Sequence, residues 1–145
     1  MATKSSLRHI LLNPYVQINT ILAGAIVAIL IYSGIFSATG NYPVHSYYEL
    51  MTGEISPSSG LSRAFSEIVR FHFQQALVFN PYSIRIFGFF FIQLILRIAF
   101  SLLVTAKSSY ANKIVVADII LSLIYMIYAF LPFITFLATQ ASKKF

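Results

Sequence analysis

Residues 82–106 read YSIRIFGFFFIQLILRIAFSLLVTA, an apolar run of the length needed to cross a lipid bilayer. A helix needs about 20 residues to cross a hydrocarbon core of roughly 30 Å. Residues 114–137 form a second such run, and residues 15–37 form a third that carries no charged side chain. We therefore predict an all-α membrane protein with three transmembrane helices.

The composition supports a membrane location. Of the 145 residues, 58% are hydrophobic, 16% are aromatic and only 10% are charged, which is unlike a soluble globular protein. The length suits one domain, so we expect a single membrane domain over residues 1–145. The net charge of +6 comes from basic residues scattered in ones and twos near the helix ends. Phospholipid headgroups are therefore the expected counter-ions, and nucleic acid is not a predicted partner.

The sequence gives no support to a metal site or a redox centre. Cysteine is absent, and the three histidines lie far apart without the spacing of metal ligands. We predict neither a metal nor another cofactor. The basic residues that flank the predicted helices divide at about four on each side, so the positive-inside rule is tied. We prefer the N-terminus inside, because the acidic residues of the long loop region dilute its positive charge.

A short pattern occurs twice, each time directly before a predicted membrane helix. Asn13-Pro14 and Asn80-Pro81 are both followed by tyrosine. Asparagine suits the position that caps a helix, and proline suits the first helical position, where its missing N–H costs nothing. The tyrosine ring suits the headgroup level. The pattern predicts two helix starts of the same kind, although it is also a common way to begin any helix.

Between the first two spans we expect a loop over residues 38–57 and an amphipathic helix over residues 61–79. Apolar side chains recur at helical spacing in the second of these segments, with polar side chains opposite them. With about 19 residues and six polar positions, this helix is expected to lie in the membrane interface rather than to cross it. Pro57 and Gly60 are expected to form the turn that leads into it.

The polar face of this helix carries Arg63, Glu67 and Arg70 at a spacing that lets the glutamate pair with either arginine. This face is either a solvated surface or a site for a lipid headgroup or a partner protein. His72 lies on the opposite, apolar face, where it is expected either to pack inward or to face a partner. No serine, aspartate or second histidine stands at a spacing that would orient His72 as a base, so we do not predict an enzyme.

Arg97 lies near the middle of the second span, where an unpaired charge costs at least about 3 kcal/mol. The second and third spans are joined by a short connection and are expected to run antiparallel. Counted from that connection, Asp118 is about five residues nearer to it than Arg97 is, which is a distance of about 7 Å along the helix. An extended arginine side chain reaches that far. Gln93 shares the face of Arg97 and is able to join the pair. The pair is either a structural lock between two helices or part of an ion or proton path.

The stretch over residues 56–81 resembles an uncharacterised family of small bacterial membrane proteins, a domain of unknown function. The family signature is Cys-Pro-x-Cys-Gly-Leu-Thr-Arg-Ala, then Gly-Asp, an alanine and Asn-Pro. Serine replaces both cysteines, at Ser56 and Ser59, and Phe71-His72 stands where Gly-Asp is usual. The residues that match are Pro57, Gly60, Leu61, Arg63, Ala64, Ala76, Asn80 and Pro81. The resemblance implies a membrane location and a helical hairpin, and the family carries no known activity. We expect a multi-pass protein of the bacterial inner membrane.

We expect a non-catalytic accessory or structural subunit of a larger bacterial membrane complex, with other membrane protein subunits and phospholipids as partners. Three spans this apolar have more apolar surface than they bury against one another. Residues 23–28 also contain a small-residue face suited to helix contact. One alternative is a small transporter or an ion-path component that uses Arg97 and Asp118. Another is a membrane enzyme that acts on lipid through Arg63, Glu67 and His72.

Overall fold

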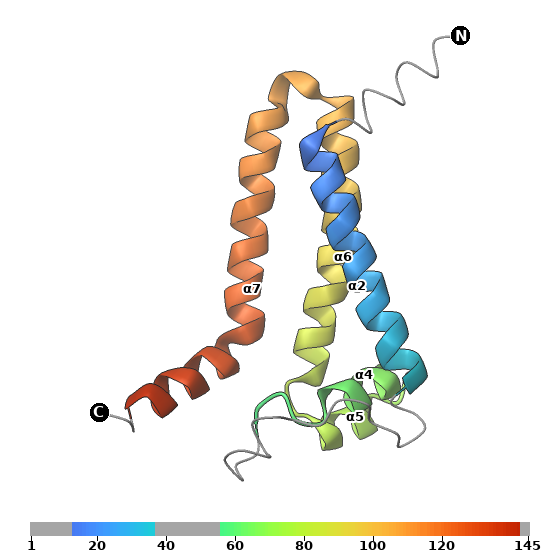
Figure 1. Ribbon diagram of the computed structural model, residues 1–145, viewed down its shortest axis with the longest axis vertical. Coiled ribbons are helices and arrows are strands. Elements are labelled where there is room, and N and C mark those ends of the chain that lie inside the picture. Colours follow the sequence, from blue (N-terminus) through green and yellow to red (C-terminus); the bar gives the residue numbers. More distant parts are fainter. Residues whose placement is uncertain (1–12, 37–55, 143–145) are drawn as a thin grey trace. The chain divides into compact units, whose positions relative to one another are not determined.

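The computed structural model describes residues 13–36 and 56–142, and these residues form helices and turns without a strand (Figure 1). The elements are α2 (Pro14–Phe36), α4 (Leu61–Val69), α5 (Phe73–Phe79), α6 (Ser83–Ala106), the 3-10 turn η2 (Ser108–Tyr110) and α7 (Ala111–Ser142). The all-α class predicted from the sequence is therefore confirmed for this part of the chain. The predicted loop over residues 38–57 lies outside the described residues except at its last two positions.

Three helical segments are long and apolar enough to cross a membrane by length and composition: Pro14–Gly34, Ser83–Ala106 and Ser108–Ser142. The first two agree closely with the predicted spans 15–37 and 82–106. The third helix is longer than the predicted span 114–137, because its polar ends continue the helix. With 32 residues, α7 extends about 48 Å at 1.5 Å per residue. It contains Pro132, and Figure 1 shows a bend in the second half of this helix, as expected where proline removes a helical hydrogen bond.

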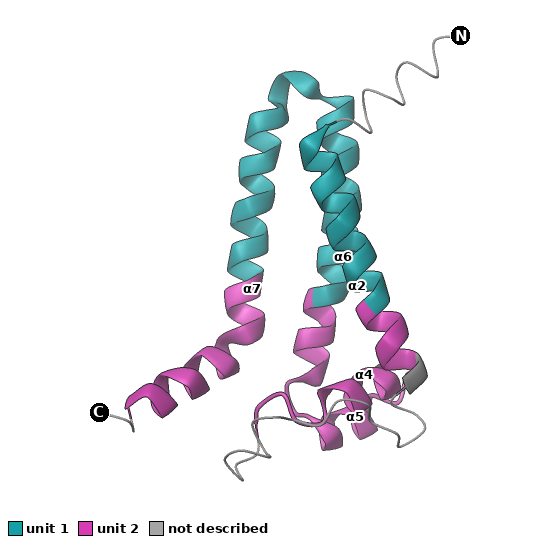
Figure 2. Cartoon of the chain, in the orientation of Figure 1, with its two compact units in different colours: residues 1–28, 90–125 teal, residues 29–89, 126–145 magenta. Residues whose placement is uncertain are grey.

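The chain divides into two compact units, shown in Figure 2. Unit 1 comprises residues 1–28 and 90–125, and unit 2 comprises residues 29–89 and 126–145. The sequence suggests one domain, and the pattern of contacts resolves two units within it. Each of the three long helices contributes residues to both units, so the division does not fall at a linker between successive segments of the chain.

The buried residues of unit 1 are mostly polar. Among its described residues, Asn19, Gln93, Arg97 and Asp118 are buried alongside only two aliphatic side chains, Val16 and Val104. Large aliphatic side chains of the same helix segments point outward, including Ile21 and Leu102, which are 71% and 64% exposed. Polar groups inside and apolar groups outside are the arrangement that a lipid solvent favours, because lipid cannot hydrogen-bond a polar group.

Unit 2 has a small apolar core around the two short helices. Phe65 of α4 packs edge-on against Phe87 of α6 with ring centroids 5.3 Å apart, and Ile68 is buried beside the fully buried Ala64 and Ala76. The helices α4 and α5 pack against each other. Phe65 and Ile68 belong to the apolar side chains that recur at helical spacing in this segment, and both are buried.

The prediction of a single helix over residues 61–79 is wrong. The helix is interrupted at Arg70–His72, and the segment forms the two helices α4 and α5. Helix α4 ends with Phe71 N–H bonded to the Ile68 carbonyl and His72 N–H bonded to the Glu67 carbonyl, each at 2.9 Å. Phe71 has a φ of 64°. These are the two bonds and the left-handed residue of a Schellman motif, a helix ending that normally uses glycine. The segment contains neither glycine nor proline between residues 61 and 79, so its sequence gives no signal of the break.

Candidate functional site

The first candidate site is a polar cluster in unit 1, centred on Arg97. Its Nη2 atom donates to Asp118 Oδ1 and, at 2.5 Å, to Ser122 Oγ, while Nη1 donates to Asn19 Oδ1 at 3.0 Å. Arg97 is 9% exposed and Asp118 is 1% exposed. The Arg97–Asp118 pair predicted from the sequence is therefore present, and the cost of a buried charge is offset by an opposite charge and two further acceptors.

The cluster continues through hydroxyl and amide groups of all three long helices. Tyr15 of α2 donates its hydroxyl hydrogen to Asp118 Oδ2 at 2.6 Å, and Asn19 Nδ2 donates to Ser101 Oγ at 3.2 Å. Ser122 Oγ lies 3.3 Å from Gln93 Oε1, so Gln93 joins the pair through Ser122 rather than by contacting Arg97. The cluster therefore connects α2, α6 and α7 within unit 1.

Sequence analysis did not predict the contribution of α2 to this cluster. Tyr15 and Asn19 are four residues apart, so they share one face of the helix. The available signal was Asn19 itself, a polar residue within an apolar span. Its amide needs hydrogen-bond partners that lipid cannot supply, which indicates a buried contact. Two cluster atoms, Gln93 Nε2 and Arg97 Nε, are buried without a protein partner. A cavity of about 250 Å³ lies at this site, lined by residues of α2 and α6 that include Asn19 and Arg97.

The chemistry of the cluster suits a structural role. Its one arginine and its one acid are bonded to each other, so their charges cancel. Asp118 is the only acidic residue in the described part of unit 1, and a proton relay would need further titratable groups along a path. No group of three potential metal-binding side chains occurs among the described residues.

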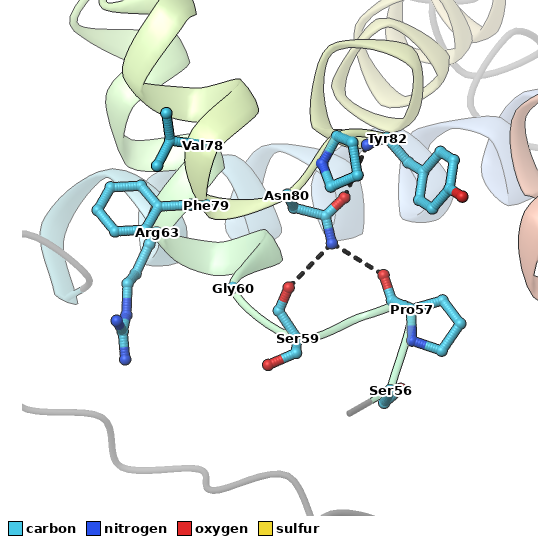
Figure 3. Close-up of a pocket in the computed structure, with 10 residues that line it drawn as sticks. Ser56, Pro57, Ser59, Gly60, Arg63, Val78, Phe79, Asn80 and Tyr82 are labelled. Carbon is cyan, nitrogen blue, oxygen red and sulfur yellow. Dashed lines mark hydrogen bonds between the residues drawn. The ribbon is translucent and has the colours of Figure 1, made fainter. Parts of the chain in front are cut away.

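The second candidate site lies in unit 2, where the turn before α4 meets the start of α6. Asn80 is 3% exposed, and its Nδ2 atom donates to the backbone carbonyls of Pro57 and Ser59 at 2.8 and 2.9 Å. Its Oδ1 atom accepts from Tyr82 N–H at 2.9 Å. Figure 3 shows these three bonds converging on one side chain. Asn80 therefore fixes the turn and the entry to α6 at the same time.

The two Asn-Pro motifs have the same local bond but begin their helices differently. Asn13 Oδ1 accepts from Tyr15 N–H at 3.0 Å, which matches the bond that Asn80 makes to Tyr82. Helix α2 begins at Pro14 as predicted. Helix α6 begins at Ser83 rather than at Pro81, because Ser83 N–H first closes a turn onto the Asn80 carbonyl.

Gly60 completes the turn at a position where a side chain would clash with the backbone of Phe79. Its φ is 73°, and a Cβ atom there would lie 2.4 Å from the carbonyl oxygen of Phe79. The predicted turn at Pro57 and Gly60 is present, and Gly60 caps α4 without a side-chain hydrogen bond. The backbone of the turn consequently lies against the end of α5 at a distance that no other residue would permit.

A pocket of about 490 Å³ opens where these segments meet (Figure 3). The polar residues of its wall are Ser56, Ser59, Arg63, Asn80 and Tyr82, and none of the described residues that line it is acidic. The guanidinium of Arg63 lies 5.8 Å from the centre of the Phe79 ring, within the range of a cation–π contact. The remaining lining residues are Pro57, Gly60, Val78, Phe79 and Pro81.

Of the residues predicted for contact with a headgroup or a partner, which are Arg63, Glu67, Arg70 and, on the apolar face, His72, only Arg63 lines this pocket. Glu67 pairs with His72 at 2.9 Å rather than with an arginine. The prediction that His72 packs inward is wrong, because its side chain is 63% exposed. The interruption of the helix at residues 70–72 removes His72 from the buried face of α4. Arg70 donates to the hydroxyl and carbonyl oxygens of Ser66 and, at 3.3 Å, to the carbonyl of Gly34.

Arg85 makes a further contact in unit 2 that sequence analysis missed. Its Nε atom donates to the carbonyl of Ala129 at 3.2 Å, and its guanidinium lies 4.9 Å from the centre of the Tyr128 ring. Both partners belong to the turn of α7 that precedes Pro132. Arg85 therefore stabilises the contact between α6 and α7 within unit 2, and its presence in an apolar span was the signal for a buried partner.

No protein-family model, curated protein or solved structure matches this chain. The two sites are therefore interpreted from their own geometry and chemistry.

Proposed function

We propose that the protein is a non-catalytic accessory subunit of a larger protein complex in the bacterial inner membrane. The observation that carries this proposal is the apolar surface of the three candidate spans. In an apolar stretch of 18 residues within each span, only 22%, 17% and 11% of the stretch, respectively, is buried inside the chain. Outward side chains such as Ile21 and Leu137, which are 71% and 67% exposed, need either lipid or protein to cover them.

Lipid covers aliphatic side chains as well as protein does, so a protein partner must be argued from shape. Gly24 lies in the middle of α2, and a Cβ atom added there would meet nothing within 4 Å. Its neighbours Ala23 and Ala25 are also small. Small residues let a second helix approach closely, which raises the van der Waals contact that holds membrane helices together. This face of α2 is the expected contact with another subunit.

The polar groups of unit 1 fit the same role. The charged pair and its neighbours connect three helices and neutralise one another, so the cluster supplies a rigid support and no reactive group. A hydrogen-bonded chain from Tyr15 through Asp118 and Ser122 to Gln93 favours the second candidate function, a component of a proton or ion path. That function ranks lower because Arg97 and Asp118 are bonded to each other, and the described part of unit 1 contains no second acidic side chain to continue a path.

Photo-crosslinking in native membranes tests the accessory role. A photoreactive amino acid replaces Gly24, and a matched variant carries it at Ala117, an exposed small residue of α7. We expect crosslinks to another polypeptide from position 24 and mainly lipid adducts from position 117. Lipid adducts alone at both positions, with the chain correctly inserted, would contradict the proposal.

A further inference from the structure

The interruption between α4 and α5 exposes an aromatic pair in unit 2. Phe71 and Phe73 are 79% and 45% exposed, and their rings meet edge-on with centroids 6.3 Å apart. We propose that this pair inserts into the interfacial region of the lipid bilayer and holds the two short helices at the membrane surface. The proposal requires that the chain lies in a membrane but does not require a partner subunit. It can therefore fail independently of the accessory role.

The outward position of Phe71 results from the end of α4. Ala64 and Ile68 are buried on the inward face of this helix, and Phe71 follows them by seven and three positions. A continuous helix would therefore place Phe71 on the same buried face. Helix α4 ends before that position, Phe71 has a φ of 64°, and its side chain is exposed.

The backbone of Phe71 favours a role outside the fold. A left-handed φ is unfavourable for a residue other than glycine, and a helix ending of this kind normally uses glycine. An exposed phenylalanine makes few contacts within the chain that would offset this cost. An unfavourable conformation that presents a large apolar side chain to the surroundings indicates contact with an apolar surface outside the chain.

A contact with α2 sets the expected depth of the pair. Arg70 donates to the carbonyl oxygen of Gly34 at 3.3 Å, and Gly34 is the last residue of the candidate span Pro14–Gly34. The 21 residues of this span extend about 32 Å, close to the hydrocarbon core of roughly 30 Å. Gly34 is therefore expected where the hydrocarbon meets the headgroups. Phe71 directly follows Arg70, so it lies within one arginine side-chain length of that level.

The connection to α6 gives the same depth. Three residues separate Phe79, the end of α5, from Ser83, the first residue of the second candidate span. Within unit 2, α4 and α5 lie at the ends of the α2 and α6 segments (Figure 2). Both short helices are therefore expected at the level of the headgroups, where an apolar ring reaches the first methylene groups of the acyl chains.

The size of the pair favours lipid over a protein partner. Two aromatic side chains bury at most about 500 Å² when they are fully covered, whereas a specific protein interface buries about 800 Å² on each partner. A lipid surface requires no such minimum area. Arg70 adjoins the pair, and basic residues beside aromatic ones are typical of segments that lie in the membrane interface.

Tryptophan fluorescence tests the proposal, because the chain contains no tryptophan. The full-length Phe71→Trp variant is reconstituted into phosphatidylcholine vesicles whose acyl chains carry bromine, a quencher, either near the glycerol or near the methyl end. We expect bromine near the glycerol to quench more strongly and water-soluble acrylamide to quench weakly. We also expect emission at shorter wavelength than that of tryptophan in water. Circular dichroism checks that the variant remains folded.

Ile95→Trp is the matched control for depth. Ile95 is exposed near the middle of α6, so bromine near the methyl end is expected to quench this variant more strongly. Phe73→Trp places a second probe in the same pair and is expected to behave as Phe71→Trp does. This second probe keeps the proposal testable if Phe71→Trp does not fold.

Three results would overturn the proposal. Strong quenching by acrylamide without quenching by bromine would place the pair in water. Protection from both quenchers would show that another part of the chain or a second copy covers the pair. Stronger quenching of Phe71→Trp by bromine near the methyl end, as in the Ile95 control, would place the pair in the hydrocarbon core rather than at the interface.

Discussion

The polar cluster of unit 1 and the turn of unit 2 bury different kinds of polar side chain. In unit 1, the charged Arg97 is buried and bonded to Asp118, Asn19 and Ser122. In unit 2, the neutral Asn80 is buried and bonded to the backbone carbonyls of Pro57 and Ser59. A buried charge must be neutralised by an opposite charge, whereas a buried amide needs only hydrogen-bond partners, which the backbone supplies. The first region therefore neutralises a charge between helices, and the second fixes a turn against the start of α6.

The largest effect is expected when one half of the buried pair is removed. Asp118→Ala leaves Arg97 as an unpaired buried cation, which we expect to lower the free energy of unfolding by about 3–5 kcal/mol. Reversible unfolding in mixed detergent micelles measures this loss. The double variant Arg97→Leu with Asp118→Leu removes both charges and is expected to lose much less. If the double variant were as unstable as Asp118→Ala, the pair would not be the reason for the loss.

The turn of unit 2 is expected to depend on its glycine. Gly60→Ala places a Cβ atom 2.4 Å from the Phe79 carbonyl at a φ of 73°, so we expect a loss of about 2–3 kcal/mol in the same unfolding measurement. Gly24→Ala is the matched control, because its Cβ would meet nothing, and it is expected to be neutral or stabilising by up to about 1 kcal/mol. Similar effects of the two changes would disprove the close approach at Gly60.

The two Asn-Pro motifs differ in what their asparagines hold. Asn80→Ala removes an acceptor and a donor that serves two backbone carbonyls, so we expect it to cost about 2–3 kcal/mol of unfolding free energy. Asn13→Ala removes the equivalent bond at the start of α2 and is expected to cost about 1 kcal/mol. The difference between the two values measures the contribution of the hydrogen bonds from Asn80 to the carbonyls of Pro57 and Ser59. Equal values would show that Asn80 acts only as a helix cap.

The smallest effect is expected at Phe71, and its sign is opposite. Phe71 is 79% exposed and has a φ of 64°, a conformation that costs a residue other than glycine roughly 1–2 kcal/mol. Phe71→Gly is therefore expected to raise the free energy of unfolding by about 1 kcal/mol, whereas Phe73→Gly, at the first residue of α5, should lower it by up to about 1 kcal/mol. Destabilisation by both changes would contradict the Schellman ending of α4.

The hydropathy of the sequence and the expected depth of each residue in the membrane predicted the three spans and the Arg97–Asp118 pair. The three spans follow from apolar length, and the Arg97–Asp118 pair follows from counting residues back from the connection between two antiparallel helices. The contribution of Asn19 depends on the rotation of α2 about its own axis. Because large apolar side chains are distributed all around α2, its hydropathy pattern gives no preferred face.

The pocket was only partly predictable for a different reason. The turn at Pro57 and Gly60 and the helix start at Asn80 were each recognised locally. The bond between them joins residues more than 20 positions apart, and local propensity contains no information about it. Phe71 has a left-handed φ of 64°, a conformation that glycine usually supplies at a helix end. The phenylalanine therefore concealed the end of α4 from sequence analysis.

The mass of the particle that a mild detergent releases from native membranes tests the accessory role most directly. The chain alone has a mass of 16.3 kDa. The proposed function predicts a heavier particle that contains other polypeptides at fixed stoichiometry and that loses them when a leucine replaces Gly24 but not when it replaces Ala117. A monomer or homodimer that retains full biological activity would contradict the accessory role and would favour a self-contained ion or proton path.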